Sequence, residues 1–280
     1  MNTQEFIIAA LAEDIGSGDH STLASIDAKV AGSAKLIVKE AGIIAGIRIA
    51  KEVFLHLDKE AVFTAYHTDG EYLEVGTIAF TVKAKAQAIL QAERLVLNTM
   101  QRMSGIATLT HSYMEKIKNY STTILDTRKT TPLFRAFEKE AVLLGGAKNH
   151  RMGLYDMIML KDNHIDYCGG IEKAIAAANN YLKEQQLQLP IEVETRSLDD
   201  VKRVVKVGGV QRIMLDNFTP QEIEAALVLI NKQFETEASG GINFDTIEAY
   251  AATGVDFISV GAVIHHATSL DLSLKAVLHE

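Results

Sequence analysis

The fold is decided by residues 191–216, which read IEVETRSLDDVKRVVKVGGVQRIMLD. Two short apolar runs, 191–194 and 212–215, predict buried strands, and the stretch 198–207 between them has helical periodicity. A strand, a helix and a second strand in this order form a unit whose two strands run parallel. The stretch therefore predicts an α/β fold.

Outward from this stretch the same alternation recurs in both directions. Every further apolar run ends in polar or charged residues, and helical segments separate the runs. The runs lie at 123–126, 157–160, 234–237 and 257–260, and the helical segments include 170–186, 220–231 and 243–253. The pattern predicts an incomplete, six- or seven-stranded βα barrel with its active site at the carboxyl ends of the strands.

The first part of the chain has a different pattern. Alternating apolar residues predict strands at 30–38, 61–67 and 77–85, and helical spacing predicts helices at 1–14, 47–57 and 87–103. We expect Gly105 to end the last of these helices. The prediction is an α+β domain with an antiparallel sheet over residues 1–110 and a barrel domain over 111–280. This division allows the C-terminal tail to pack back on the first domain.

Composition narrows the class of protein. The chain has 280 residues, a net charge of −8 and one cysteine, Cys168, which cannot form an internal disulfide and so favours a reducing compartment. Residues 1–6, MNTQEF, lack the features of a signal or transit peptide, and no apolar run approaches the ~18 residues that span a bilayer. We expect a cytoplasmic protein that binds neither membrane nor nucleic acid.

A basic island interrupts this acidic chain, since residues 126–164 hold seven Lys or Arg against five Asp or Glu. Arg128 and Lys129 follow a predicted strand, where arginine offers a planar fork for a carboxylate and lysine a point charge for phosphate. His150 and Arg151 follow a glycine-rich turn that lets the backbone approach a ligand. The island predicts a site for a small anion.

Three further strand ends carry chemistry. Lys161 follows one strand and suits either a Schiff-base nucleophile or an anion binder. Glu194 and Asp216 end two adjacent strands, where carboxylates can hold Mg²⁺. The glycine-rich turns after the last two strands, which contain Ser239, Gly240, Gly241 and Gly261, predict a phosphate site.

These features together predict a barrel that binds a phosphate at its last strands, a divalent cation at its middle strands and a polyanion at its first. A phosphorylated sugar with a carboxylated partner would satisfy all three. One rival is a βα barrel lyase that uses Lys161 as a Schiff-base amine, in which borohydride would trap the substrate. Another rival is a non-catalytic phosphosugar-binding protein, against which the intact Lys161, Glu194 and Asp216 argue.

The chain resembles the quinolinate phosphoribosyltransferases nearly from end to end. Two motifs, KNHR at 148–151 and KDNH at 161–164, are specific to few families at this spacing. The resemblance also rests on EDIGSGD at 13–19, QRMSGIAT at 101–108, DTRKTTP at 126–132, EVE at 192–194, LDN at 215–217, ASGGI at 238–242 and SVG at 259–261.

The resemblance implies an N-terminal open sandwich, an incomplete βα barrel and a homodimer in which each subunit's first domain closes the partner's barrel. It implies a reaction of quinolinate with phosphoribosyl pyrophosphate, dependent on Mg²⁺, that gives nicotinate mononucleotide, CO₂ and pyrophosphate in NAD biosynthesis. Carried over by motif, the residues that bind quinolinate would be Arg102 from the partner subunit and Arg128, His150, Arg151 and Lys161. The catalytic residues would be Lys129, Lys161, Glu194 and Asp216, and the last two would support the metal. The phosphate would be held by Lys129, Ser239, Gly240, Gly241, Gly261 and His265.

Two positions depart from the family pattern. Leu133 stands where the family commonly has a glycine, and Ala147 stands for the third glycine before the KNHR motif. Neither change removes a charged group, so we expect an effect on affinity before an effect on function. A related transferase acting on nicotinate or another pyridine stays open, although the number of cations favours a substrate with two carboxylates.

Overall fold

A computed structural model of the chain describes residues 2–277. Contacts divide the chain into two compact units, which we describe separately. The first unit contains the segments up to residue 111, from 130 to 146 and from 266 onward, and the second contains 112–129 and 147–265. The boundary predicted after residue 110 falls inside helix α4 (Ala86–Lys116).

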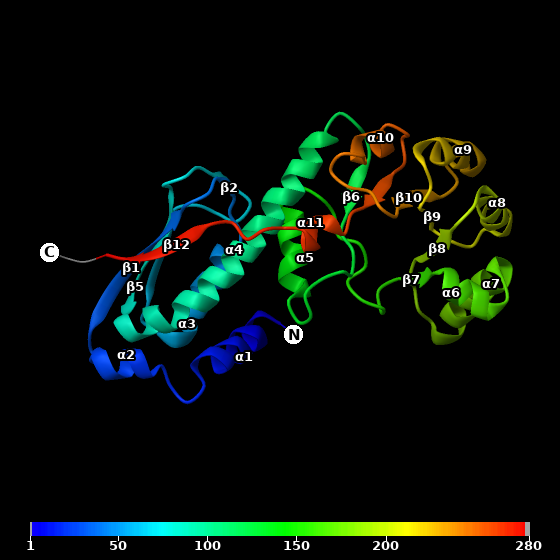
Figure 1. The fold of residues 1–280 in the computed structure, drawn as a ribbon. Helices are drawn as coiled ribbons and strands as arrows, with labels where there is room; N and C mark the ends of the chain where they lie inside the picture. The colour runs from blue at the N-terminus through cyan, green and yellow to red at the C-terminus, as the bar shows by residue number, and fades with distance from the viewer. Residues whose placement is uncertain (1, 278–280) are drawn as a thin grey trace. The chain divides into compact units, whose positions relative to one another are not determined.

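An antiparallel sheet of four strands forms the centre of the first unit, in the order β12-β1-β5-β3 (Figure 1). The strands are β1 (Ala31–Val38), β3 (Val62–Ala65), β5 (Ile78–Lys85) and β12 (Leu272–Ala276). Alternate residues of β1 are buried, as the period of two predicted. The C-terminal strand β12 pairs along β1, from Ala34 opposite Ala276 to Val38 opposite Leu272.

Helices complete the first unit. Helix α3 (Ile47–Leu57) packs on the sheet through β3 and β5, and α1 (Thr3–Ile15) contacts α3. Phe54 of α3 and Phe80 of β5 are fully buried and lie with their ring centroids 6.2 Å apart. The remaining elements of the unit are α2 (His20–Ser25), α5 (Arg135–Leu144) and the small pair β2 (Gly42–Ile43) and β4 (Tyr72–Leu73).

The expected helix end at Gly105 is wrong, because α4 continues through Gly105 to Lys116. The absence of a side chain at Gly105 instead allows another backbone segment to pass close to the helix. A Cβ at this position would lie 2.9 Å from the carbonyl carbon of Thr268, closer than real Cβ atoms come to backbone. The segment after residue 265 thus passes directly over α4 within the first unit.

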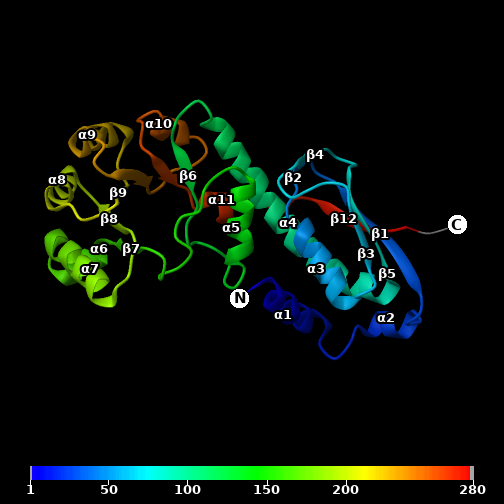
Figure 2. The ribbon, with the colours of Figure 1, turned by 180° about the vertical axis from the view of Figure 1, so that it is seen from behind.

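The second unit is built on a six-stranded parallel sheet in the order β6-β11-β10-β9-β8-β7. Among the described residues the edge strands β6 and β7 do not pair with each other, so the predicted incomplete barrel is confirmed. Helices α7, α8 and α9 run along one side of β7, β8 and β9 (Figure 2). The strands are β6 (Thr123–Leu125), β7 (Ile158–Leu160), β8 (Ile191–Thr195), β9 (Arg212–Asp216), β10 (Glu235–Ser239) and β11 (Phe257–Ser259). The helices are α6 (Asp162–Cys168), α7 (Ile171–Gln185), α8 (Leu198–Val207), α9 (Pro220–Ile230), α10 (Ile247–Ala251) and α11 (Ala262–His265).

Candidate active site

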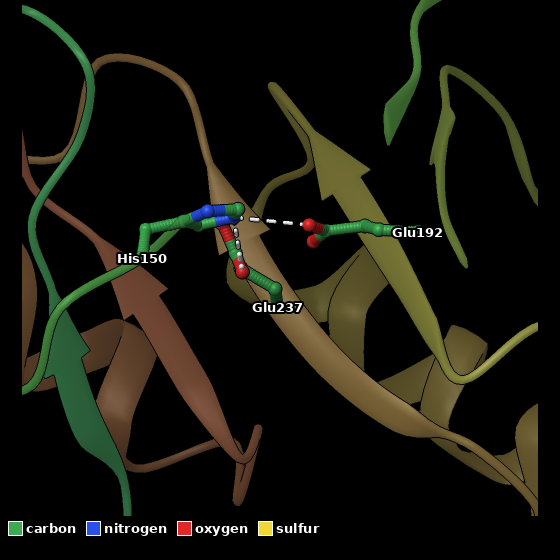
Figure 3. Close-up of side chains that lie close together, drawn as sticks. All are labelled: His150, Glu192 and Glu237. Atoms are coloured by element: carbon green, nitrogen blue, oxygen red, sulfur yellow. Dashed lines mark ion pairs between the residues drawn. The ribbon is translucent and has the colours of Figure 1, made fainter. Parts of the chain in front are cut away.

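Inside the second unit a histidine meets two glutamates from neighbouring regions of the sheet (Figure 3). His150 Nε2 lies 2.9 Å from Glu192 Oε2 on β8 and 3.4 Å from Glu237 Oε2 on β10. Both glutamate side chains are fully buried, and that of His150 is 4% exposed. His150, which the KNHR motif predicted as a ligand of quinolinate, therefore points its Nε2 toward buried carboxylates.

The backbone around residue 148 explains how His150 reaches this position. Lys148 forms an isolated parallel bridge to Leu125 at the edge of the sheet. The buried carboxylate of Asp126 accepts a hydrogen bond of 2.8 Å from the backbone N–H of His150. The segment is thus fixed beside β6, and the imidazole extends from there into the sheet's interior.

The two glutamates of this cluster differ in their hydrogen bonds. Glu237 also accepts a hydrogen bond of 2.9 Å from Arg212 and one from the Ser259 hydroxyl. Among the described residues neither carboxylate oxygen of Glu192 accepts a hydrogen bond, and this carboxylate faces His150 Nε2 at 2.9 Å. Such a buried network stabilises only if its charges are mutually satisfied, because each unpaired ion costs several kcal/mol in a protein interior.

The pKa values in the cluster follow from burial and from these contacts. Burial alone would lower the pKa of His150, but the two glutamates outweigh it and raise the pKa to about 9. Burial and the negative charge of Glu237 raise the pKa of Glu192 to about 7. Burial works against ionisation of Glu237 too, yet the contacts with His150 and the Ser259 hydroxyl hold its pKa below the usual range. The backbone N–H of Arg151 donates a hydrogen bond of 2.6 Å to His150 Nδ1, so in this structure Nδ1 carries no proton and the ring proton lies on Nε2, facing the glutamates. The raised pKa means that the ring takes up a second proton readily, at the cost of that hydrogen bond.

Two arginines of the basic island lie close together in the same unit. Burial and the positive charge of Arg128 lower the pKa of Arg151, and the Arg151 guanidinium donates a hydrogen bond of 3.2 Å to the carbonyl of Met157. Arg151 is 9% exposed, whereas Arg128 is exposed. Two like charges held together, one of them largely desolvated, form an arrangement that an anion would stabilise.

Carboxylates lie at the carboxyl ends of β8 and β9, as predicted. Glu194 shares the inward side of β8 with Glu192, two residues earlier, because side chains alternate along a strand. Burial and the negative charge of Asp216 raise the pKa of Glu194, and the positive charge of Lys161 opposes that rise. Lys161 follows β7 directly and is exposed. These three charged groups thus gather at one end of the sheet.

Glycine turns after β10 and β11 lie beside these groups. Gly240 has φ of 94°, and a Cβ there would lie 2.9 Å from the backbone nitrogen of Asn217, so only glycine fits. Asn217 donates a hydrogen bond of 2.6 Å to Asp216 and so connects this turn to the carboxylate. A Cβ on Gly261 would lie 3.0 Å from His265 Nε2 and 3.3 Å from Lys129 Cδ. The predicted phosphate-binding residues thus gather around these two turns.

Arg102 is the one predicted site residue that belongs to the first unit. It donates hydrogen bonds of 3.0 and 2.9 Å from Nε and Nη2 to Glu138 Oε1, and one of 2.9 Å from Nη1 to the carbonyl of Ala267. Its side chain remains 25% exposed. Arg94 and Asn98, the other members of the predicted polar face of α4, are exposed.

The two departures from the family pattern have different structural settings. Leu133 is 77% exposed and has φ of 63°, a left-handed conformation that suits glycine and strains leucine. Ala147 is buried and does not have a positive φ. Ala147 is therefore unstrained, and the backbone strain lies at Leu133 instead.

Sequence reasoning assigned no role to several residues that the structure brings to these sites. Glu192 and Glu237 precede the predicted residues Glu194 and Ser239 by two positions on the same strands, and this period of two could have placed them inward. Asn217 was noted only as part of a motif. The remaining residues of this kind, Arg212 and Glu138, carried no local signal in the sequence.

Comparison with known proteins agrees with this arrangement. The model of the quinolinate phosphoribosyltransferase N-terminal domain matches residues 19–104, and that of the C-terminal domain matches residues 106–275. A rice protein named nicotinate-nucleotide pyrophosphorylase [carboxylating], chloroplastic, is 43% identical over 95% of this chain and 75% of its own length. A Synechocystis protein named probable nicotinate-nucleotide pyrophosphorylase [carboxylating] is 41% identical over 95% of this chain and 90% of its own length.

Solved structures show the same relationship. The crystal structure of NadC from Streptococcus pyogenes has a TM-score of 0.92 at 39% identity and covers 97% of this chain and 95% of its own. The nicotinate-nucleotide pyrophosphorylase from Francisella tularensis has a TM-score of 0.92 at 37% identity, with coverage of 98% and 96%. The fold and the site define a phosphoribosyltransferase with a βα barrel. The chain belongs to the quinolinate phosphoribosyltransferase family.

Proposed function

We propose that this chain transfers phosphoribose from phosphoribosyl pyrophosphate to quinolinate and releases CO₂, giving nicotinate mononucleotide for NAD biosynthesis. The observation that carries the proposal is the gathering, in one family-matched unit, of paired arginines, strand-end carboxylates and glycine turns. Each group suits one part of this pair of substrates. Quinolinate has two carboxylates, and the donor has phosphate at both ends.

Arginines and other cations would bind the quinolinate carboxylates. Burial and the positive charge of Arg128 lower the pKa of Arg151, so a dianion bound beside both arginines would relieve their repulsion. Lys161 lies at the same end of the sheet, near Glu194. His150 lies buried behind the site with its Nε2 toward Glu192 and Glu237, and its raised pKa lets it take up positive charge there. Arg102 would serve the site of the partner subunit in a homodimer.

The chemistry needs charge stabilisation more than a strong base. The pyridine nitrogen attacks C1 of the ribose as the C1–O bond to pyrophosphate breaks and the leaving group takes the electron pair. The ring nitrogen is then cationic, so the C2–carboxylate bond can break to CO₂ and leave its electron pair on the ring, which gains a proton. Fixed cations around the two substrates stabilise the charges that develop on this route.

Glu194 and Asp216 fit a divalent cation by their chemistry, since Mg²⁺ prefers oxygen ligands. Burial and the negative charge of Asp216 raise the pKa of Glu194, and a cation between the two carboxylates would relieve their repulsion. Bound there, Mg²⁺ would neutralise the leaving pyrophosphate. Lys129, Ser239, Gly240, Gly241, Gly261 and His265 would hold the 5′-phosphate, and the glycine turns leave room for it.

Two further parts of the proposal concern assembly and location. A homodimer is the assembly in which Arg102 can complete a neighbouring site. A cytoplasmic location fits the lone Cys168 and the phosphorylated substrates. Within residues 2–277 we find no helix that is long and apolar enough to cross a membrane.

The test is to mix the protein with quinolinate, phosphoribosyl pyrophosphate and Mg²⁺ and to follow nicotinate mononucleotide and CO₂. Parallel reactions replace quinolinate by nicotinate, or omit Mg²⁺. Product from quinolinate alone, dependent on Mg²⁺, is the expected result. Product from nicotinate without CO₂ would assign the related pyridine transferase instead. Trapping of a substrate on Lys161 by borohydride would assign a Schiff-base lyase.

A further inference from the structure

Glu138, in the first turn of helix α5, has an environment that the proposed reaction does not explain. Its side chain is fully buried, and its Oε1 accepts both hydrogen bonds from Arg102. Thr131 also donates to it, from the hydroxyl to Oε1 at 2.9 Å and from the backbone N–H to Oε2 at 2.8 Å. One carboxylate therefore joins helix α4 to the loop that follows Arg128 and Lys129 in sequence.

The same turn of α5 holds the preceding residue of the loop. Arg135, the first residue of α5, donates a hydrogen bond of 2.9 Å from Nε to the Thr130 hydroxyl. Two consecutive threonines are thus fixed by two side chains of α5. A buried carboxylate is costly unless it is paired, and here Arg102 supplies the opposite charge.

The contacts fix the direction of the Arg102 guanidinium. Glu138 holds it through Nε and Nη2, and the carbonyl of Ala267 holds Nη1. An arginine that is not held in this way samples many rotamers and loses that freedom when it grips a ligand. Arg102 nevertheless keeps a quarter of its side chain exposed. It is therefore both accessible and oriented before any ligand arrives.

We propose that Glu138 is a positioning residue that orients Arg102 for a substrate carboxylate and couples it to the Thr130–Thr131 loop. This inference rests on the proposed function, in which Arg102 binds quinolinate. Glu138 itself is buried and would not touch the substrate. Its effect should pass through Arg102 and should fall on quinolinate rather than on the phosphoribosyl donor.

The experiment is a double-mutant cycle of Glu138→Gln and Arg102→Ala, with steady-state kinetics for both substrates. Glu138→Gln keeps the shape of the side chain but replaces the charged acceptor. We expect it to raise KM for quinolinate about tenfold, from the loss of charge-assisted hydrogen bonds, and to leave kcat and KM for the donor within about twofold. In the Arg102→Ala background the same change should have almost no effect on KM for quinolinate.

Two further variants separate positioning from general destabilisation. Glu140→Gln makes the same change two residues along α5, where the carboxylate pairs with Arg48 at 3.0 Å, and should leave KM for quinolinate unchanged. Thr131→Val removes only the hydroxyl that donates to Glu138, and should raise KM for quinolinate about twofold to threefold. It serves as the informative variant if Glu138→Gln does not fold.

The outcomes distinguish this inference from the proposed function. A wild-type protein that makes no nicotinate mononucleotide overturns the function; calorimetric titration of the same variants with quinolinate then still decides whether Glu138 acts through Arg102. Wild-type turnover with an unchanged KM for quinolinate in Glu138→Gln overturns the positioning role alone. An equal rise in KM with and without Arg102 also overturns it.

Discussion

The two units bury charge in different ways, and both clusters include a cation predicted to bind quinolinate. In the second unit His150 meets two carboxylates, Glu192 and Glu237, deep in the sheet. In the first unit Arg102 meets the carboxylate of Glu138 and keeps part of its side chain exposed. An imidazolium can lose its proton, whereas an arginine in a protein does not. The cluster of the second unit therefore provides a titratable side chain, and that of the first unit provides a permanent, oriented charge.

The largest expected effect comes from breaking the cluster of the second unit. Glu237→Gln leaves His150 and Arg212 with one fewer carboxylate in a buried site, so the free energy of unfolding should fall by about 3–5 kcal/mol. Denaturant unfolding measures it. Glu235→Gln is the matched control, because Glu235 pairs with the same Arg212 but has a side chain that is 54% exposed; its loss should cost less than about 1 kcal/mol. Equal effects of the two variants would mean that burial does not govern this cluster.

The cluster of the first unit should instead show its main effect in activity, and across subunits. Arg102→Ala should weaken quinolinate binding by about 1.5–3 kcal/mol through loss of a charge-assisted carboxylate contact. Mixed with Lys161→Ala under subunit exchange, it should recover about a quarter of wild-type activity, because half of the random dimers hold one intact site of two. The measurement is turnover before and after exchange. If no activity returns although exchange is demonstrated, Arg102 does not complete a partner's site.

Much of the fold could be predicted from the sequence because the barrel elements have local signals. Strands β8 and β9 are short apolar runs, since parallel strands are buried on both faces, and the helix between them ends as its periodicity predicted. Helix α4 shows where local reasoning fails. Glycine is typical of helix ends, yet Gly105 lies within α4 because its Cα hydrogen leaves room for the backbone of Thr268, which is far away in the sequence.

The same limit applies to the candidate site. The charged residues at the strand ends were predictable because the ends of parallel strands meet at one edge. The buried partners were not, because Glu237 reaches His150, and Glu138 reaches Arg102, only through the tertiary fold. Helix α5 adds a second obstacle, since Glu138 and Lys139 are buried beside Phe137 and leave no clean apolar stripe to read.

A pH titration separates the two clusters, because a histidine can lose its proton near neutral pH and an arginine cannot. The contacts with glutamate raise the pKa of His150 from an ordinary 6.5 to about 9, so their stabilisation is complete below pH 6.5 and is lost as pH rises through about 9. A pKa moved from 6.5 to about 9 corresponds to about 3 kcal/mol, so the free energy of unfolding should fall by up to about 3 kcal/mol across this window. Unfolding in urea at several pH values measures it. Glu192→Gln should move the loss to lower pH, whereas His67→Gln, at the more exposed pair with Glu71, should leave the profile unchanged. A flat wild-type profile would contradict a protonated His150.

The smallest effect concerns the strain beside the Glu138 anchor of the first unit. The turns after β9 and β10 place asparagine or glycine at their left-handed positions, Asn217 and Gly240, whereas the loop after Thr131 places Leu133 at φ of 63°. Since Leu133 is 77% exposed, little packing offsets this strain. Leu133→Gly should therefore raise the free energy of unfolding by about 0.5–1 kcal/mol, after allowing for the greater freedom of glycine in the unfolded chain.

Denaturant midpoints at a constant m-value measure this difference. The matched control is Leu143→Gly, another exposed leucine of the first unit, which lies within helix α5 and should lose about 1 kcal/mol because glycine disfavours helix. Opposite signs for the same exchange at two exposed leucines would locate the strain in the backbone of the loop. Destabilisation at both positions would mean that Leu133 contributes packing, and that the loop anchored by Glu138 is not strained at this residue.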